Sequence, residues 1–396
     1  MKRATTKRRG AIAPLTAILL VFLIGMVAFA VDTGWMVLSQ TNLQNAADAS
    51  ALAGANPLMS AYVQYSVSTS SSTKTTILNA AMASARANAK LYAGYNSAGG
   101  VKSLALNDSD VEFGFTDAKN NYTPAPTFTG FPNTIKVRLR LDSQANQPLN
   151  LFFGPVLGTK TSSLNAIAAA TIYGGQVNSF STNGNVGLLP ITYDVNHWNS
   201  FVATGQSPDG TTQNDANGVP QLQVYPSVKF SGNFGQLSLS NSHVGESTES
   251  GWVQNGASPS DIQALISANL IPLANHPANT WDWQGDTGFK ASLVMTINNY
   301  VGQTFMLPLF TPVNAGTAAN NYSDYQAGTG NGSHYYYDIV QFVAVTIQQP
   351  SSSNRQVVVQ PAAMIEPNAI LNPATIAPVG TSSQLVTTFT TPKLTQ

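Results

Sequence analysis

Hydrophobic and polar positions divide the chain into a helical stretch at its start and strand-like segments from Val101 onward. Residues 11–31 are apolar throughout and carry no charge: AIAPLTAILLVFLIGMVAFAV. Twenty-one helical residues span about 31 Å, which matches a hydrocarbon core of about 30 Å. Pro14 lies in the first turn, where its missing N–H costs little. We therefore predict a transmembrane helix over residues 11–31.

The helical pattern continues beyond the apolar run, from Asp32 to Ala55, without a proline. Gln40, Gln44 and Asp48 recur at every fourth position and form a polar stripe, with small and apolar residues on the other face. We expect a juxtamembrane helix over 32–56, a polar loop over Asn56–Thr73, and a second helix over Thr75–Ala93. The second helix is predicted from residues that recur at 3–4 spacing and give an alanine-rich face suited to close packing: Leu78, Ala81, Met82, Ala85, Ala89 and Tyr92.

The period then changes to that of strands. Ile135–Leu141 alternates strictly, with apolar residues on one face and three cations on the other. We interpret the cationic face as a solvated outer face of an antiparallel sheet, with an anion site as the alternative. Leu164–Tyr173 is a second strand candidate, and Gly174-Gly175 ends this first unit.

Beyond residue 178 the pattern predicts a mostly antiparallel β domain, a sandwich or a partly closed barrel. Its strand candidates are Leu222–Tyr225, Gln236–Leu239, Ser292–Ile297, Thr304–Leu309 and Ile339–Ile347. One helix is expected, because Ser258 suits an N-cap, Pro259 the first helical position and Asp261 the first turn. The predicted fold class is α+β: a long N-terminal transmembrane and amphipathic helix, a small α+β domain, and the β domain.

The composition excludes several classes of site and of binding partner. The chain has 396 residues, of which 9% are charged and 43% hydrophobic, with 18 basic residues, 18 acidic residues and no cysteine. Absence of cysteine excludes a disulfide framework, a Cys-ligated zinc site, an iron–sulfur cluster and thiol catalysis. Balanced charge argues against nucleic-acid binding, which usually needs a basic face.

Charge asymmetry around the apolar run predicts its orientation. Five of the basic residues precede the run, and the next one is Lys74. The positive-inside rule then keeps the N-terminus in the cytoplasm and exports the rest, which has 13 basic and 18 acidic residues. Ala28-Phe29-Ala30 offers an alternative, a cleavable signal peptide, although the run exceeds the usual 7–15 residues of such a segment.

The N-terminal stretch resembles a known family. Arg8-Arg9-Gly10, the apolar run, Val31-Asp32-Thr33-Gly34 and then LQNAADASALA over 43–53 are similar to the TadG-like N-terminal segment of Tad/Flp pilus-assembly proteins. Looser similarity to the TadE/TadG group extends to Val111–Gly114, Pro132–Arg138 and Leu151–Gly158. The resemblance implies a pilus-associated protein and no known catalytic activity.

Two features of related proteins are missing. Type IV prepilins carry a Glu five residues after the cleaved Gly, whereas Leu15 follows Gly10 at that distance. The resemblance therefore does not imply a processed major pilin. A von Willebrand A metal site needs Asp-x-Ser-x-Ser, and Asp48-Ala49-Ser50-Ala51-Leu52 lacks the second serine.

The resemblance and the pattern together give a domain plan. It comprises a basic cytoplasmic tail (1–10), a transmembrane helix (11–31), a juxtamembrane helix (32–56), a pilin-like α+β domain (57–177), a β-rich domain (178–348) and a Pro/Ser/Thr-rich C-terminal segment (349–396).

Candidate chemistry is sparse. The four histidines are isolated, so none has the spacing of a local metal site, and no P-loop, G-x-S-x-G or G-x-G-x-x-G motif occurs. Trp281, Asp282, Trp283 and Asp286 combine indoles that can stack a sugar with carboxylates that can act as acid and base. Tyr335 and Tyr337 are candidates for ligand or protein contacts. The alternative for these residues is an ordinary core or interface cluster.

Two functions follow from these observations. The leading hypothesis is a non-enzymatic, single-pass component of Tad/Flp pilus assembly or a related envelope structure, in the bacterial inner membrane and without a cofactor. Small residues of the apolar helix would then pack against envelope proteins or a second copy: Gly25, Ala28, Ala30 and Gly34. The alternative is an exported carbohydrate-binding protein or glycoside hydrolase centred on Trp281–Asp286.

Overall fold

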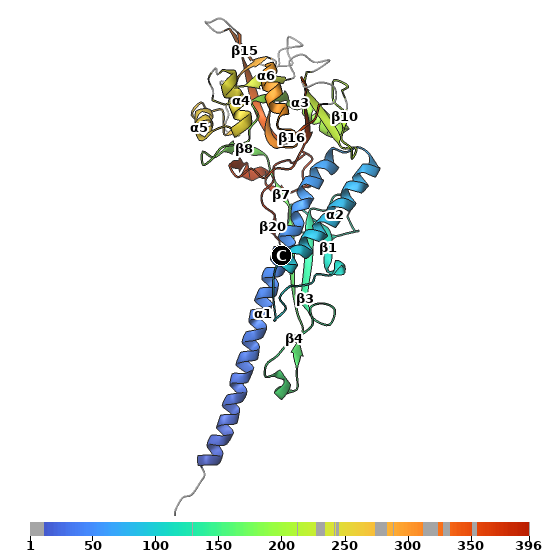
Figure 1. The fold of residues 1–396 in the computed structure, drawn as a ribbon, viewed down its shortest axis with the longest axis vertical. Coiled ribbons are helices and arrows are strands. Elements are labelled where there is room, and N and C mark those ends of the chain that lie inside the picture. Colours follow the sequence, from blue (N-terminus) through green and yellow to red (C-terminus); the bar gives the residue numbers. More distant parts are fainter. Residues whose placement is uncertain are drawn as a thin grey trace, which may run out of the picture.

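The computed structural model describes residues 12–128, 130–211, 213–226, 234–240, 242, 245–273, 283–287, 289–311, 324–327, 333–350 and 355–395. One long helix runs through most of the length of the molecule (Figure 1). A lower lobe of helices and sheet lies along its C-terminal half, and an upper lobe lies beyond its end. The α+β class predicted from the pattern is confirmed.

Helix α1 (Ile12–Val67) contains 56 residues and is roughly 84 Å long at 1.5 Å per residue. The two predicted helices, over 11–31 and 32–56, are therefore one. The predicted polar loop over Asn56–Thr73 is wrong, since α1 continues through Pro57 and only three residues separate it from α2 (Ser71–Gly94). Burial explains the extension, because apolar side chains beyond Pro57 pack into the lower-lobe core: Leu58, Met59, Tyr62 and Val63.

A five-stranded antiparallel sheet completes the lower lobe. Its order is β2 (Tyr122–Pro124), β1 (Val111–Thr116), β3 (Thr134–Leu141), β6 (Leu164–Thr171) and β20 (Lys393–Leu394). Strand β3 confirms the predicted alternation, because its apolar residues are buried. Its cations lie on the outer side, where Arg140 pairs with Asp110 at 2.7 Å and Arg138 is exposed.

Small residues let α1 approach α2 and the sheet closely. Buried alanines of α2 and β6 form much of the contact surface: Ala81, Ala85, Ala89, Ala166, Ala168 and Ala170. Gly54 of α1 lies at the centre of this contact. A Cβ atom there would stand 2.6 Å from Ile135 Cδ1, 3.1 Å from the carbonyl oxygen of Ala85 and 3.2 Å from Ala89 Cβ. The helix therefore has room for hydrogen alone at this position.

The described part of the upper lobe is built on one large sheet with four helices. Its order is β10 (Gln213–Asn214), β11 (Pro220–Tyr225), β17 (Val357–Pro361), β16 (Ser333–Gln348), β13 (Trp283–Thr287), β12 (Phe234–Leu237), β9 (Ile191–Asp194) and β14 (Thr304–Thr311), with β15 (Asp324–Ala327) on β16. Strand β14 also pairs with β16, so five strands form a closed circuit. Of the two expected architectures, a sandwich or a partly closed barrel, this is the partly closed barrel. Among the described strands, β9 and β14 pair in parallel.

The helices of the upper lobe are α3 (Val195–Thr204), α4 (Glu246–Asn255), α5 (Pro259–Ser267) and α6 (Ala291–Asn298). Helix α5 confirms the predicted cap, since Ser258 and Asp261 form a capping box. The expectation of a single helix is wrong. The strand predicted over Ser292–Ile297 is helix α6, whose buried residues Leu293, Val294 and Ile297 have helical spacing.

The C-terminal segment contributes to both lobes. Strand β17 lies between β11 and β16, an interior position where an edge strand or an extended tail was expected. Further along, β18 (Ala369–Leu371) pairs with β8 (Val177–Phe180), and β19 (Ala377–Pro378) pairs with β7 (Tyr173–Gly174). Strand β20 then joins the lower sheet beside β6. Two passages of chain therefore connect the lobes.

We predict that Gly54→Leu destabilises the lower lobe by about 1–3 kcal/mol, because the side chain must displace α2 or β3. Thermal or denaturant unfolding of the full chain in detergent measures this. Gly25→Leu is the matched control, because nothing lies within 4 Å of a Cβ atom there. Equal stability of the two variants would contradict the close contact described.

Candidate functional site

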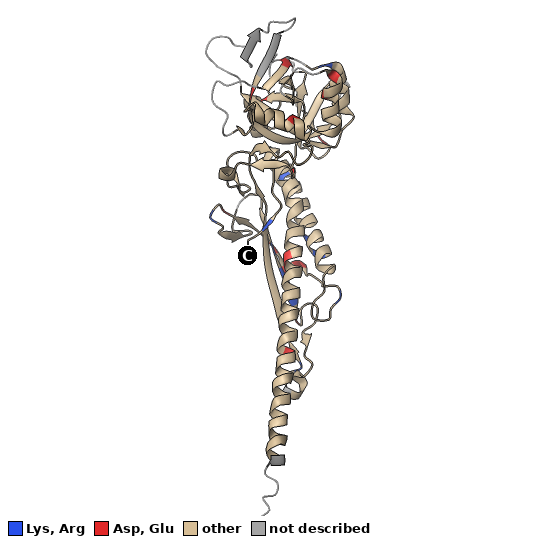
Figure 2. Ribbon diagram, turned by 90° about the vertical axis from the view of Figure 1, so that its left-hand side faces the viewer, with Lys and Arg blue, Asp and Glu red and all other residues tan. Residues whose placement is uncertain are grey.

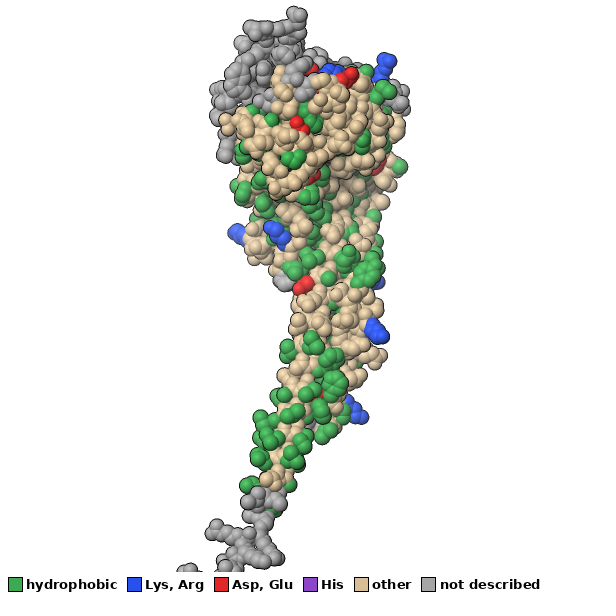
Figure 3. All heavy atoms as spheres, turned by 60° about the vertical axis from the view of Figure 1, so that its left-hand side comes forward, with side chains coloured by type: hydrophobic (Ala, Val, Ile, Leu, Met, Phe, Trp, Pro, Cys, Tyr) green, Lys and Arg blue, Asp and Glu red, His purple; other side chains and the backbone are tan. Residues whose placement is uncertain are grey.

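The N-terminal third of α1 is an exposed apolar surface. Residues 12–31 carry no charge, and the most apolar 18-residue window of the helix has a mean hydropathy of 2.6 and is 6% buried. Figure 2 shows charged residues on the lobes and none on α1 below Asp32, and Figure 3 shows hydrophobic side chains covering this part. Within the described chain, α1 is the one helix long and apolar enough to cross a membrane. A core helix of a soluble protein with this composition would be buried.

At the end of this surface, α1 holds a loop of the lower lobe. The loop connects β4 (Leu149–Asn150) to β5 (Thr161–Ser162) and contains the short 3-10 helix η2 (Gly154–Leu157). The Asp32 carboxylate accepts hydrogen bonds from the backbone N–H of Phe152 at 2.7 Å and of Phe153 at 3.1 Å. The Trp35 indole N–H donates to the Asn150 carbonyl at 3.2 Å.

Sequence reasoning did not assign Asp32 or Trp35 a role. The only signal was that VDTG and the loop residues Leu151–Gly158 both belong to the stretches that resemble the TadE/TadG group. Nothing in one sequence indicates that positions 120 residues apart make a hydrogen bond.

The four residues expected to pack helix against helix do not share one face. Each residue of an α-helix advances about 100°, so Gly25 and Gly34 lie on opposite sides. A Cβ atom at either glycine would meet nothing within 4 Å. Ala28 lies one turn before Asp32 on the side that holds the loop, and it is buried. Ala30 and Gly34 lie one turn apart, and both are exposed.

Three residues of the carbohydrate alternative lie together on β13 and β16, but two of their side chains are buried. Trp283 is 1% exposed and packs against Phe342 with a ring separation of 6.0 Å, so its indole offers no face to a sugar. Tyr337 is 2% exposed; its ring covers Gly235 and Gly285, and its hydroxyl donates to the Asp286 carbonyl. Asp286 is partly buried on β13. Trp281, Asp282 and the Tyr335 side chain lie outside the described residues.

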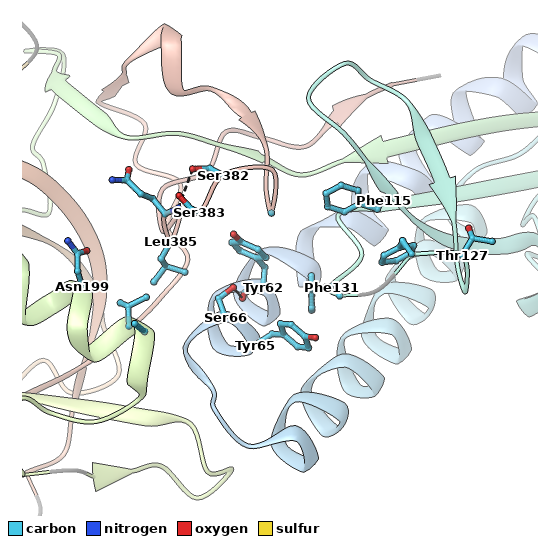
Figure 4. A pocket seen from close by; sticks show the side chains of 16 residues that line it. Tyr62, Tyr65, Ser66, Phe115, Thr127, Phe131, Asn199, Ser382, Ser383 and Leu385 are labelled. Carbon is cyan, nitrogen blue, oxygen red and sulfur yellow. Dashed lines mark hydrogen bonds between the residues drawn. The ribbon is translucent and has the colours of Figure 1, made fainter.

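A cleft of about 930 Å³ lies where the lobes meet (Figure 4). Five aromatic rings contribute to its wall: Tyr62 and Tyr65 from α1, and Phe115, Phe128 and Phe131 from the lower lobe. The upper lobe adds Asn199 and Val202 of α3, and the C-terminal segment adds Ser382–Leu385. Its described lining residues include no carboxylate, histidine or basic side chain, so the cleft combines ring faces with neutral hydroxyl and amide groups.

Tyr62 is the most buried titratable group of this cleft. Burial raises the pKa of its phenol above 10.0, and hydrogen bonds with Ser66 and the Gly380 backbone offset part of the rise. The phenol is therefore a neutral group at physiological pH. Its hydroxyl can form hydrogen bonds at an otherwise apolar wall, but it does not serve as a general base.

The geometry defines a class: an α+β protein with two lobes on a helix whose free end is apolar. Residues 10–56, which comprise that end and the start of the buried helix, match the family described as putative Flp pilus-assembly TadE/G-like. The TadG-like resemblance of the N-terminal segment is thereby confirmed. No curated protein and no solved structure matches the chain.

We predict a specific alkaline destabilisation from Tyr62. Its folded pKa exceeds its unfolded value of 10.0, so its contribution to stability is fully present below pH 10 and is lost as the pH rises through the folded pKa. Tyr62→Phe keeps the ring and removes this titration. Denaturant unfolding at a series of pH values should show a shallower alkaline decline for Tyr62→Phe than for the parent chain. Identical declines would show that Tyr62 ionises freely in the folded protein.

Proposed function

We propose that this protein is a non-enzymatic, single-pass component of a Tad/Flp-type pilus-assembly apparatus in the bacterial inner membrane, with both lobes outside the cytoplasm. The observation that carries the proposal is that one continuous helix, α1, has both an exposed apolar end and a part that is buried in the core of the lower lobe. Residues 14–31 carry no charge and are exposed apart from Ala28, and the remainder of the helix is a core element of the lower lobe. The family match, over residues 10–56, covers the exposed apolar end of α1 and the start of its buried part.

The unbroken helix α1 joins the proposed membrane span rigidly to the lower lobe, which suits a component of an assembly apparatus. A helix that leaves the bilayer and enters a packed core cannot turn without turning the lobe. Because α1 is unbroken from Ile12 to Val67, forces at the membrane act directly on the lower lobe. The pilin-like character proposed for the lower lobe agrees with this arrangement, a long helix packed on an antiparallel sheet.

Orientation is proposed from charge. All five basic residues of the N-terminal tail precede the span, and no basic residue follows it until Lys74. The positive-inside rule places such a tail in the cytoplasm. The lobes, with their acidic excess, would then lie in the periplasm.

One side of the span is available for a partner helix. Gly34 lies about 200° around the axis from Asp32, so it faces away from the loop that Asp32 holds. With Ala30 it forms a pair of small residues four apart, which permits close helix–helix approach in membranes. We place a second copy of the chain or another assembly component on this side.

Single-cysteine labelling tests anchoring and orientation cleanly, because the chain has no cysteine. A membrane-impermeant maleimide should label Ser72→Cys, an exposed position of the lower lobe, in spheroplasts. It should label Ala4→Cys only after lysis, because the tail is expected inside. Deletion of residues 12–31 should release the protein from carbonate-washed membranes. Labelling of Ala4→Cys in intact spheroplasts, or a full chain released by carbonate, would refute the topology.

The partner side is tested with two glycine variants. Gly34→Leu should strongly reduce recovery of the detergent-solubilised complex, while the protein stays in the membrane fraction. Gly25→Leu lies on the opposite side and should leave recovery unchanged. Pull-downs with differently tagged copies separate self-association from binding of another component. Equal recovery with both variants would remove Ala30 and Gly34 as the packing surface.

A further inference from the structure

The loop beside the start of the lower lobe exposes apolar side chains although it is firmly held. Phe152 is 64% exposed and Val156 is 85% exposed, with Phe153 also exposed. No charged residue occurs from Leu151 to Thr159, and Lys160 stands at the base. Apolar groups gathered in this way usually mark a contact surface with a membrane or a partner.

The loop has a defined shape. The Leu151 N–H donates to the Lys160 carbonyl at 3.1 Å, and the Thr159 N–H donates to the Gly154 carbonyl at 2.9 Å. Gly154 is required at the crossing, because a Cβ atom there would stand 2.1 Å from the Thr159 carbonyl oxygen. Its apolar tip is therefore presented by a closed turn.

Asp32 fixes the height of this tip. Asp32 is 5% exposed, and its carboxylate accepts hydrogen bonds from the N–H groups of Phe152 and Phe153. The centroid of the Trp35 ring lies 5.7 Å from that of the Phe152 ring. Twenty residues precede Asp32 in α1, and they span about 30 Å, the thickness of a hydrocarbon core. The tip is thus held at the level where the apolar span ends (Figure 1).

We infer that residues 151–157 form a second membrane contact, in which Phe152, Phe153 and Val156 enter the interfacial layer of the same leaflet from which α1 emerges. This inference rests on the proposed membrane anchor. The apolar surface of the loop continues that of the span, whose last turn exposes Phe29 and Val31. Trp35 and Lys160 flank the tip with the residue types that favour the bilayer interface.

A lipid surface fits this loop better than a protein partner does. The exposed side chains follow the end of an apolar helix, and residues 151–159 of the loop carry no charged group that would select a partner. A helix and a loop that both enter one leaflet fix the tilt and rotation of α1, which a single span does not. The lobes are then held in one orientation above the membrane.

Nitroxide quenching in phosphatidylcholine vesicles tests the inference with the full chain. An environment-sensitive nitrobenzoxadiazole label is attached at Val156→Cys, at Phe22→Cys in the span, or at Ser72→Cys on the lower lobe. Lipid with a nitroxide near the glycerol end of the acyl chain should quench the Val156→Cys label, and lipid with a nitroxide near the end of the acyl chain should quench the Phe22→Cys label, because Phe22 lies near the middle of the span. Neither lipid should quench the Ser72→Cys label. Quenching at Phe22→Cys without quenching at Val156→Cys would overturn the loop contact and leave the anchor standing. A blue-shifted, unquenched Val156→Cys label would indicate a second protein copy there. Absence of quenching at both positions would overturn the anchor as well.

The role of Asp32 in positioning the loop is tested with the same quenching measurement. Asp32→Ala removes both acceptor oxygens and should abolish quenching at Val156→Cys while quenching at Phe22→Cys remains. Asp32→Asn keeps one carbonyl acceptor and should restore most of the signal. Asp48→Ala is the matched control, since Asp48 accepts a bond from Gln44 and none from the loop. Unchanged quenching with Asp32→Ala would remove Asp32 as the residue that sets the loop.

Discussion

Close packing of α1 against α2 and β3 is the constraint on which the structure depends. Gly54, Ala85 and Ala89 bring the elements together so closely that no additional methyl group fits at residue 54. The same packing holds α1 helical through Pro57 and places the aromatic rings of its last turns in the wall of the cleft between the lobes. Since α1 also carries the exposed apolar surface before Asp32, this one contact connects the lobes to that surface.

Asp32 resolves a problem created by that double use. In α1 an exposed apolar surface gives way to a helix packed in a core. A buried carboxylate without hydrogen-bond partners is costly, so Asp32 marks the point along the helix where the lower lobe begins to supply such partners. Here the carboxylate is buried and bonded to backbone N–H groups of the loop. Charge-assisted bonds of this kind are short and strong, so the boundary also fixes a segment distant in sequence.

Local signals predicted much of this fold. The alternation of Ile135–Leu141, the alanine face of α2 and the Ser258–Asp261 cap depend on near neighbours, and all three are present. Ser292–Ile297 was misread because Val294, Thr296 and Ile297 favour strands, whereas burial of Leu293, Val294 and Ile297 selects a helix. Asp32 with Phe152, and the rings of the cleft, come together only through tertiary packing, so no periodicity indicated them.

Helical geometry separates the two sides of α1 to which we have assigned the proposed lipid contact and the proposed partner helix. Asp32 and Trp35 face the loop, and Ala30 and Gly34 face away from it. A loop in the interface and a partner helix on the opposite side therefore do not compete for the same surface of α1. With the loop contact that we infer, the rotation of α1 would be fixed, and Ala30 and Gly34 would face one direction only. A partner helix that packs there would meet the lobes in a single orientation, which is what ordered assembly around a membrane helix requires.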